Sequence, residues 1–220
     1  MNPPLSLSVS FLLRVAVASG ALLLAVGNSS ASATNTVVVF LGDSLAAGYG
    51  VDPSESFPAL VQKKADALGK AMTVVNAGVS GDTTAGGVRR LDWLLKRPMD
   101  VLVVELGGND GLRGIPVAST RSNLVTIIHK ARERYPEVRV VLAGMQMPPS
   151  MGQDYAAQFR DLFPAVAKEE KAVLIPFLLE GVGGIESLNQ ADQIHPNVTG
   201  HKKVAETVWS ALEPLLKSKD

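Results

Sequence analysis

"TVVVFLGDSLAAGYG", residues 36 to 50, joins an apolar run to a stretch of glycine and alanine that contains one serine, Ser44. The β-branched run 36–41 predicts a buried strand, and the glycine-rich sequence after it predicts that the strand ends in a loop. Ser44 is therefore expected just beyond the carboxyl end of a strand. A serine there can serve a turn or can present a reactive hydroxyl, and the rest of the chain has to distinguish the two.

The same pattern of a short apolar run followed by a helical periodicity recurs along the chain. Further strands are predicted at 73–76, 101–106, 138–143 and 172–177. Apolar residues at helical spacing follow each strand, and the last helix contains Val204, Val208 and Leu212. Continuous apolar strands alternating with helices predict an α/β fold, a three-layer α/β/α sandwich with about five parallel strands. No linker or repeat interrupts residues 34–220, which are predicted to form one domain.

Three glycine-rich segments follow the first three predicted strands. They are "GDSLAAGYG" (42–50), "NAGVSGDTTAGG" (76–87) and "GGNDGLRG" (107–114). In open α/β sheets, ligands bind beyond the carboxyl ends of the strands. The three segments are therefore expected to share one site.

Composition narrows the possible functions. The 220 residues include 21 basic and 21 acidic side chains, so nucleic acid is not an expected partner. The absence of cysteine excludes disulfides, Cys-ligated zinc and a thiol nucleophile. His129, His195 and His201 show no metal-binding spacing, and no metal or cofactor is expected. His129 and His201 fall on predicted helices, where we expect them at the surface.

The first 33 residues differ from the rest of the chain. They contain one charged residue, Arg14, followed by twelve apolar or small residues (15–26) and by Ala31-Ser32-Ala33. This pattern predicts a signal peptide over 1–33 and a periplasmic or secreted protein with no membrane span after processing. An uncleaved anchor is the alternative, because residues 5–13 are also fairly apolar.

A nucleophilic serine needs a base and an acid that orients the base. His195 in "ADQIHPN" (191–197) is the candidate base, and Asp192 lies three residues before it. Pro196 disfavours helical angles at His195, which places the histidine on a loop. The other interpretation of this pair is a helix-capping aspartate beside an unrelated histidine.

Attack on a carbonyl creates an oxyanion, which needs hydrogen-bond donors. The candidates are the backbone N–H groups of Ser44 and Gly81 and the side-chain amide of Asn109. Asp82 or Thr83 is expected to cap the helix after Gly81. Taken singly, Gly81 also fits an ordinary turn, and Asn109 fits an Asx turn.

Four motif blocks resemble those of the SGNH (GDSL-type) hydrolases in their order along the chain. They are "GDSLAAGYG", the glycine of "SGDTT", "GGND" and "DQIHPN". The longer "VVNAGVSGDTTAGG" and "VELGGNDGLRG" are similar to the bacterial thioesterase I, lysophospholipase and arylesterase subgroup. The resemblance implies a flavodoxin-like sandwich in which Ser44 is the nucleophile and Asp192 and His195 complete the triad. It also implies an oxyanion hole of Ser44, Gly81 and Asn109.

The predicted function is hydrolysis of carboxylic esters and thioesters. The expected partner is a small-molecule acyl ester or thioester, and the sequence gives no prediction of oligomeric state. An apolar groove for the acyl chain is expected on loops after strands three to five, lined by Leu112, Ile115, Met145, Met147, Phe177 and Leu178. Two alternatives remain: a carbohydrate-ester deacetylase of the same superfamily and a non-catalytic periplasmic binding domain. The apolar loops disfavour the first, and the complete base and acid disfavour the second.

Overall fold

The central element is a five-stranded parallel sheet. The structure, a computed structural model, describes residues 35–216, so the predicted signal peptide lies outside the described residues. The strands are β1 (Thr36–Gly42), β2 (Met72–Gly78), β3 (Val101–Glu105), β4 (Arg139–Ala143) and β5 (Val173–Ile175). Their order is β2-β1-β3-β4-β5, and every neighbouring pair is parallel. The predicted parallel sheet is confirmed.

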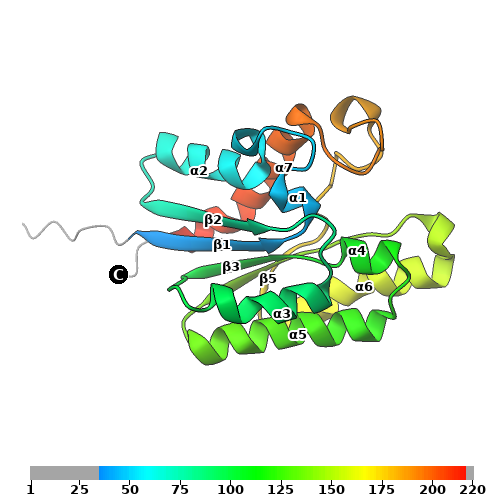
Figure 1. Cartoon of the computed structure of the whole chain (residues 1–220), viewed down its shortest axis with the longest axis horizontal. Helices are drawn as coiled ribbons and strands as arrows, with labels where there is room; N and C mark the ends of the chain where they lie inside the picture. The colour runs from blue at the N-terminus through cyan, green and yellow to red at the C-terminus, as the bar shows by residue number, and fades with distance from the viewer. Residues whose placement is uncertain (1–34, 217–220) are drawn as a thin grey trace, which may run out of the picture. The chain divides into compact units, whose positions relative to one another are not determined.

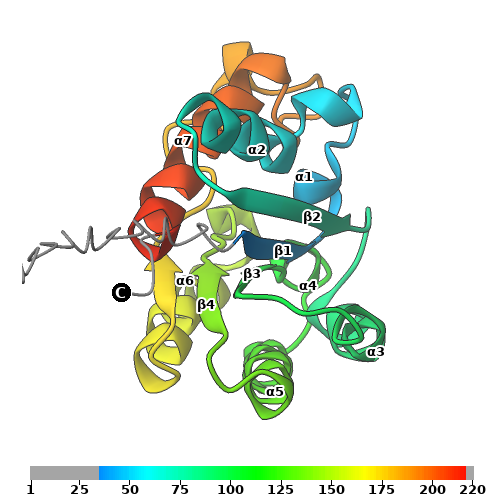
Figure 2. The same ribbon diagram turned by 90° about the vertical axis from the view of Figure 1, so that its left-hand side faces the viewer.

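Helices cover both faces of the sheet, as Figures 1 and 2 show. Helices α2 (Phe57–Ala67) and α7 (Val198–Leu212) pack together on one face. Helices α3 (Thr84–Leu94), α5 (Val117–Arg134) and α6 (Gln153–Glu169) cover the other. Short 3₁₀ turns occur at Pro53–Glu55, Pro149–Met151, Glu186–Leu188 and Glu213–Leu216. This is the predicted three-layer α/β/α sandwich.

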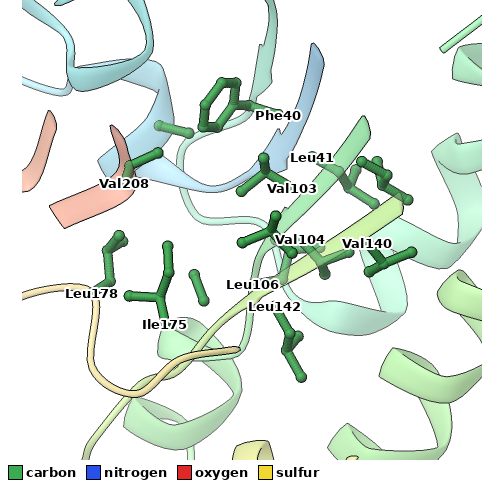
Figure 3. Close-up of a cluster of buried hydrophobic side chains, with 14 of the residues drawn as sticks. Phe40, Leu41, Val103, Val104, Leu106, Val140, Leu142, Ile175, Leu178 and Val208 are labelled. Carbon is green, nitrogen blue, oxygen red and sulfur yellow. The ribbon is translucent and has the colours of Figure 1, made fainter. Parts of the chain in front are cut away.

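The buried core extends on both sides of the sheet because alternate strand side chains point to opposite faces. Phe40 of β1 meets Phe57 of α2 edge to face, with ring centroids 5.6 Å apart. Its neighbour Leu41 lies toward α3, close to Gly87. Figure 3 shows Phe40 and Leu41 in one cluster with side chains of β3 and β4, joined by Val208 of α7.

Two short helices were not predicted from the sequence. Helix α1 (Ser44–Ala47) and helix α4 (Gly108–Leu112) occupy segments that were expected to be loops. Each is about one turn long and therefore shows no helical periodicity. In Figure 1 both lie at the arrowhead end of the strands. Of the two residues predicted to cap α3, Asp82 and Thr83, the cap is Thr83, whose side chain accepts the Gly86 N–H.

His201 is not at the surface, contrary to the expectation. It is 1% exposed in α7, and its Nδ1 accepts the Phe57 N–H at 3.2 Å. The side chain is buried because α7 packs on α2, a long-range contact that helical spacing alone does not reveal. Burial lowers the pKa of His201 to about 4, so the imidazole is neutral at pH 7.

Three residues lie side by side at the carboxyl end of the sheet: Gly78, Gly42 and Glu105. Gly42 pairs with Gly78 on one side and with Glu105 on the other. A Cβ on Gly42 would lie 2.4 Å from Glu105 Oε2, and one on Gly78 would lie 2.3 Å from the Ala47 nitrogen. Glycine at both positions therefore lets α1 lie directly on the strand ends.

Within residues 35–216, no helix is both long enough and apolar enough to cross a membrane.

Candidate active site

Ser44 is the first residue of α1, directly after β1. Asp43 caps this helix, and its Oδ1 accepts the Leu45 N–H at 3.0 Å. Gly48 ends the helix in the left-handed conformation, with φ of 74°. The strand end, the cap and the single helical turn fix the backbone of Ser44 at the carboxyl edge of the sheet.

The structure brings Ser44, His195 and Asp192 together in one line of hydrogen bonds. His195 Nε2 lies 3.0 Å from Ser44 Oγ, although the two residues are 151 positions apart. On the other side of the ring, Nδ1 lies 2.7 Å from Asp192 Oδ2. With its proton on Nδ1, the imidazole presents a basic Nε2 to the serine hydroxyl.

Asp192 is held by the loop that it shares with His195. Its Oδ1 accepts the backbone N–H groups of Ile194 and His195, at 2.9 and 3.0 Å. These hydrogen bonds, with the imidazole contact, lower the pKa of Asp192 to about 2. Asp192 is therefore an anion at neutral pH and favours a positively charged imidazole beside it.

Gln190 connects this loop to the segment after Ser44. Its backbone N–H donates to the His195 carbonyl at 2.8 Å and closes the loop. Its side-chain Nε2 donates to the carbonyls of Tyr49 and Pro196, at 2.6 and 3.0 Å. The Tyr49 ring also lies against the His195 ring, with centroids 4.6 Å apart. Gln190 was not singled out from the sequence.

The two other predicted oxyanion donors lie on the segments that follow β2 and β3. Gly81 adopts a φ of 79°, and within residues 35–216 its N–H has no hydrogen-bond acceptor. Its carbonyl accepts from Arg113 at 2.9 Å. Asn109, in α4, donates one N–H of its amide to Asp43 Oδ2 at 2.9 Å. Among residues 35–216 the second N–H of that amide has no hydrogen-bond acceptor, so it can bind a ligand.

Two charged residues that the sequence analysis missed support these loops. Arg90 of α3 donates to Asp82 Oδ2, to the Ala77 carbonyl and to the Gly42 carbonyl, and so ties the Gly81 loop to β1. Glu105, fully buried at the end of β3, accepts two backbone N–H groups of the Ser44 turn. A carboxylate within the apolar run "VLVVEL" was the available signal for Glu105.

The predicted acyl groove is only partly compatible with the structure. Leu178 and Met145 are 0% and 3% exposed and belong to the hydrophobic core, so they offer no surface to a ligand. Both lie just beyond the ends of β4 and β5, where the two segments stay paired, since the Leu178 N–H bonds to the Gly144 carbonyl. Met147 is also buried and packs over Gly111. Leu112 is exposed, and Ile115 and Phe177 are half-buried.

A comparison with protein-family models identifies the family of this chain. The model of the GDSL-like lipase/acylhydrolase family matches residues 40–203, well over half of the chain and all four motif blocks. The chain belongs to the GDSL-like lipase/acylhydrolase family. It is accordingly a carboxylic ester hydrolase of the SGNH type.

Three relatives of this GDSL hydrolase are similar over most of their length. Esterase TesA of Pseudomonas aeruginosa is 44% identical over 93% of this chain and 100% of its own. An arylesterase of Vibrio mimicus is 36% identical, covering 84% and 92%. Thioesterase 1/protease 1/lysophospholipase L1 of Escherichia coli K12 is 38% identical, covering 84% and 87%.

The fold of this GDSL hydrolase also matches a solved structure of the family. The crystal structure of TesA superimposes with a TM-score of 0.77 and 45% sequence identity. The match covers 82% of this chain and 99% of that chain. The α/β/α sandwich is thus shared with a relative whose sequence is clearly similar.

Proposed function

We propose that the protein hydrolyses carboxylic esters and thioesters through an acyl-enzyme on Ser44. The observation that carries this proposal is the continuous line of hydrogen bonds from Asp192 through His195 to the Ser44 hydroxyl. A serine hydroxyl is a weak nucleophile until a base accepts its proton, and Nε2 is within reach of it.

The reaction proceeds in two halves. Ser44 Oγ bonds to the carbonyl carbon while its proton passes to His195 Nε2, and Asp192 stabilises the resulting imidazolium. Collapse of the tetrahedral adduct breaks the C–O or C–S bond, and His195 gives its proton to the departing alkoxide or thiolate. Water then attacks the acyl-serine, again with His195 as the base. The carboxylic acid leaves and Ser44 regains its proton.

The oxyanion of each tetrahedral adduct is bound by three N–H groups in this proposal. They are the backbone N–H groups of Ser44 and Gly81 and the free N–H of the Asn109 amide. Two of them are backbone groups fixed by the ends of β1 and by the start of α3, so they need little reorganisation when the charge develops. This pre-orientation is the main electrostatic contribution expected of the site.

The substrate is proposed to carry an apolar acyl group. Exposed side chains of Tyr49, Val79, Leu112 and Ile194, named here the apolar rim, belong to the segments that carry the site residues. The names of the relatives include arylesterase and thioesterase 1/lysophospholipase L1, which is consistent with acyl substrates. The N-terminal 33 residues support a periplasmic or secreted location.

The experiment compares Ser44→Ala and Asn109→Ala with the parent enzyme on aryl-ester and acyl-thioester substrates. Ser44→Ala should lose several orders of magnitude in kcat, because no acyl-enzyme forms. Asn109→Ala should lose about 10²–10³ in kcat, the usual effect of removing one oxyanion donor.

A fluorophosphonate probe provides the independent readout. It should add one phosphonyl group to Ser44 of the parent enzyme and none to Ser44→Ala, as read by peptide mass spectrometry. If a correctly folded Ser44→Ala protein kept near-normal turnover, another nucleophile would be responsible and the proposal would be wrong.

A further inference from the structure

Glu105 is a buried acidic residue that contacts the Ser44 turn and that the proposed reaction does not use. It is 0% exposed at the carboxyl end of β3, next to Gly42 of β1. Its Oε2 accepts the backbone N–H groups of Asp43 and of Ala46, each at 3.1 Å. One carboxyl oxygen therefore holds the chain on both sides of Ser44.

Among the described residues, three of the four backbone N–H groups of residues 43–46 donate a hydrogen bond to a side chain and one does not. Those of Asp43 and Ala46 go to Glu105, and that of Leu45 goes to Asp43 Oδ1. The Ser44 N–H has no acceptor in the described part of the chain. The two carboxyl groups thus bind every competing donor of the turn and leave the one N–H that an oxyanion needs.

The second carboxyl group extends this support to the other side of the oxyanion hole. Asp43 Oδ2 accepts one N–H of the Asn109 amide, which fixes the direction of the other. Asp43 has to be ionised to hold both of its donors strongly. Two ionised carboxylates buried side by side repel each other, so one of the pair keeps a proton.

Burial identifies Glu105 as the protonated partner. Desolvation raises the pKa of Glu105 well above its usual range, and the nearby charge of Asp43 raises it further. Burial also raises the pKa of Asp43, to about 6, while its hydrogen bonds to Leu45 and Asn109 act in the opposite direction. Oε1 of Glu105 is buried without a hydrogen-bond partner among the described residues, which suits a neutral group better than an anion.

We propose that Glu105 is a positioning residue of the oxyanion hole. As a neutral carboxylic acid, it orients the Ser44 N–H through the backbone and supports Asn109 through Asp43. This inference rests on the proposed function, since it concerns how the same hydrolysis is accelerated. Glu105 touches no reacting atom, so its effect has to appear in kcat rather than in substrate binding.

The test compares Glu105→Gln with Glu105→Met, two side chains of similar length. Glutamine keeps a carbonyl oxygen for the two N–H groups and an N–H in place of the acid O–H, so kcat should stay within about tenfold of the parent value. Methionine offers no comparable acceptor, so kcat should fall by about 10²-fold, as for loss of an oxyanion donor, with KM nearly unchanged.

Glu170→Met is the matched control. Glu170 is also buried and accepts from His129 and Arg132 between α5 and α6, away from the segments that carry the site residues. Its loss should lower the melting temperature without changing kcat. A fall in kcat that is specific to Glu105→Met then separates positioning from a general loss of stability.

The outcomes distinguish this inference from the proposed function. If the parent enzyme neither hydrolyses esters nor reacts with fluorophosphonate at Ser44, the proposed function fails. If the parent reacts and a folded Glu105→Met protein keeps the parent kcat, the role of Glu105 fails. If Glu105→Met does not fold, Glu105→Gln decides. A folded glutamine variant as impaired as Asn109→Ala overturns the proposal, and near-parent kcat with unchanged KM supports it.

Discussion

Asp192 illustrates how one side chain can serve structure and chemistry together. Its two oxygens divide the tasks, since Oδ1 accepts two backbone N–H groups of its loop and Oδ2 accepts from the imidazole. Asn replaces Asp with little change in shape and can keep Oδ1 as an acceptor. The loop should therefore survive in Asp192→Asn while the imidazole loses its anionic partner.

Asp192→Asn should lower kcat by on the order of 10⁴-fold with a smaller effect on KM, because the wrong imidazole tautomer is favoured. Steady-state kinetics at pH 7 and circular dichroism check this expectation. A loss below about tenfold in a folded variant would mean that His195 acts without the aspartate.

His201 gives a prediction for stability rather than for activity. In the unfolded chain its pKa is near 6.5, whereas burial lowers the folded pKa to about 4. Between these pH values the unfolded state binds more protons, so the contribution of His201 to stability is lost as pH falls from 6.5 to 4. The loss should approach about 3 kcal/mol at most.

His201→Asn isolates this contribution, because Asn Oδ1 can still accept the Phe57 N–H. Urea unfolding at pH 7, 6, 5 and 4 should show a difference between parent and variant that shrinks or reverses toward low pH. The difference is the quantity to follow, because the raised pKa of Asp43 changes stability in the opposite sense over part of this range. A constant difference would show that His201 does not resist protonation.

At the scale of elements, the loop from Asn189 to Pro196 behaves as a closed unit. Its ends form an antiparallel bridge, and Gln190 joins it to Tyr49 beyond α1. Gln190→Ala should remove the side-chain connection and let His195 move relative to Ser44. A displacement of about 1 Å can cost about 10² in rate.

We therefore expect Gln190→Ala to reduce kcat/KM by about 10- to 100-fold. Gln62→Ala is the control, because Gln62 makes similar side-chain bonds to Val74 and Met72 near the start of β2. That variant should lose stability but keep its kinetics. Equal kinetics for the two variants would show that the connection to Tyr49 does not position His195.

The elements were predictable where a local pattern specified them. Apolar runs located all five strands, and Ser44, Gly81 and Asn109 were predicted at strand ends because glycine-rich sequence follows each strand. Glu105 was missed because the backbone groups that it binds lie 62 and 59 residues away. The role of Arg90 was missed because its bond to Gly42 spans 48 residues, and in both cases the sheet order brings the partners together. Met145 and Leu178 were assigned to a groove because apolar loop residues look alike in sequence whether they face a ligand or the core.

At the scale of the whole chain, processing is the first property to test. Cleavage after Ala33 would leave Thr34 and Asn35 before β1, which begins at Thr36. We expect protein recovered from outside the cytoplasm to have the intact mass of residues 34–220. Full-length protein in the membrane fraction would support the uncleaved anchor instead.

Substrate preference depends on which side chains are exposed along the carboxyl edge of the sheet. The apolar rim contributes four of the seven exposed large apolar side chains among residues 35–216. Its four residues lie on four separate segments of the chain, and the Tyr49 ring packs against the His195 ring. We expect an acyl chain attached to Ser44 to extend along these side chains.

Each methylene that the rim removes from water would contribute up to about 0.8 kcal/mol. Contact made equally in ground and transition states lowers KM and leaves kcat less changed. We therefore expect kcat/KM for p-nitrophenyl esters to rise from acetyl to octanoyl, mainly through KM.

Leu112→Ser should weaken this rise several-fold without affecting acetyl ester hydrolysis. Leu68→Ser, an equally exposed position at the end of α2, should change neither substrate. A series that is flat or that favours acetyl would contradict an acyl-binding rim, and the carbohydrate-ester deacetylase interpretation would then fit the site better.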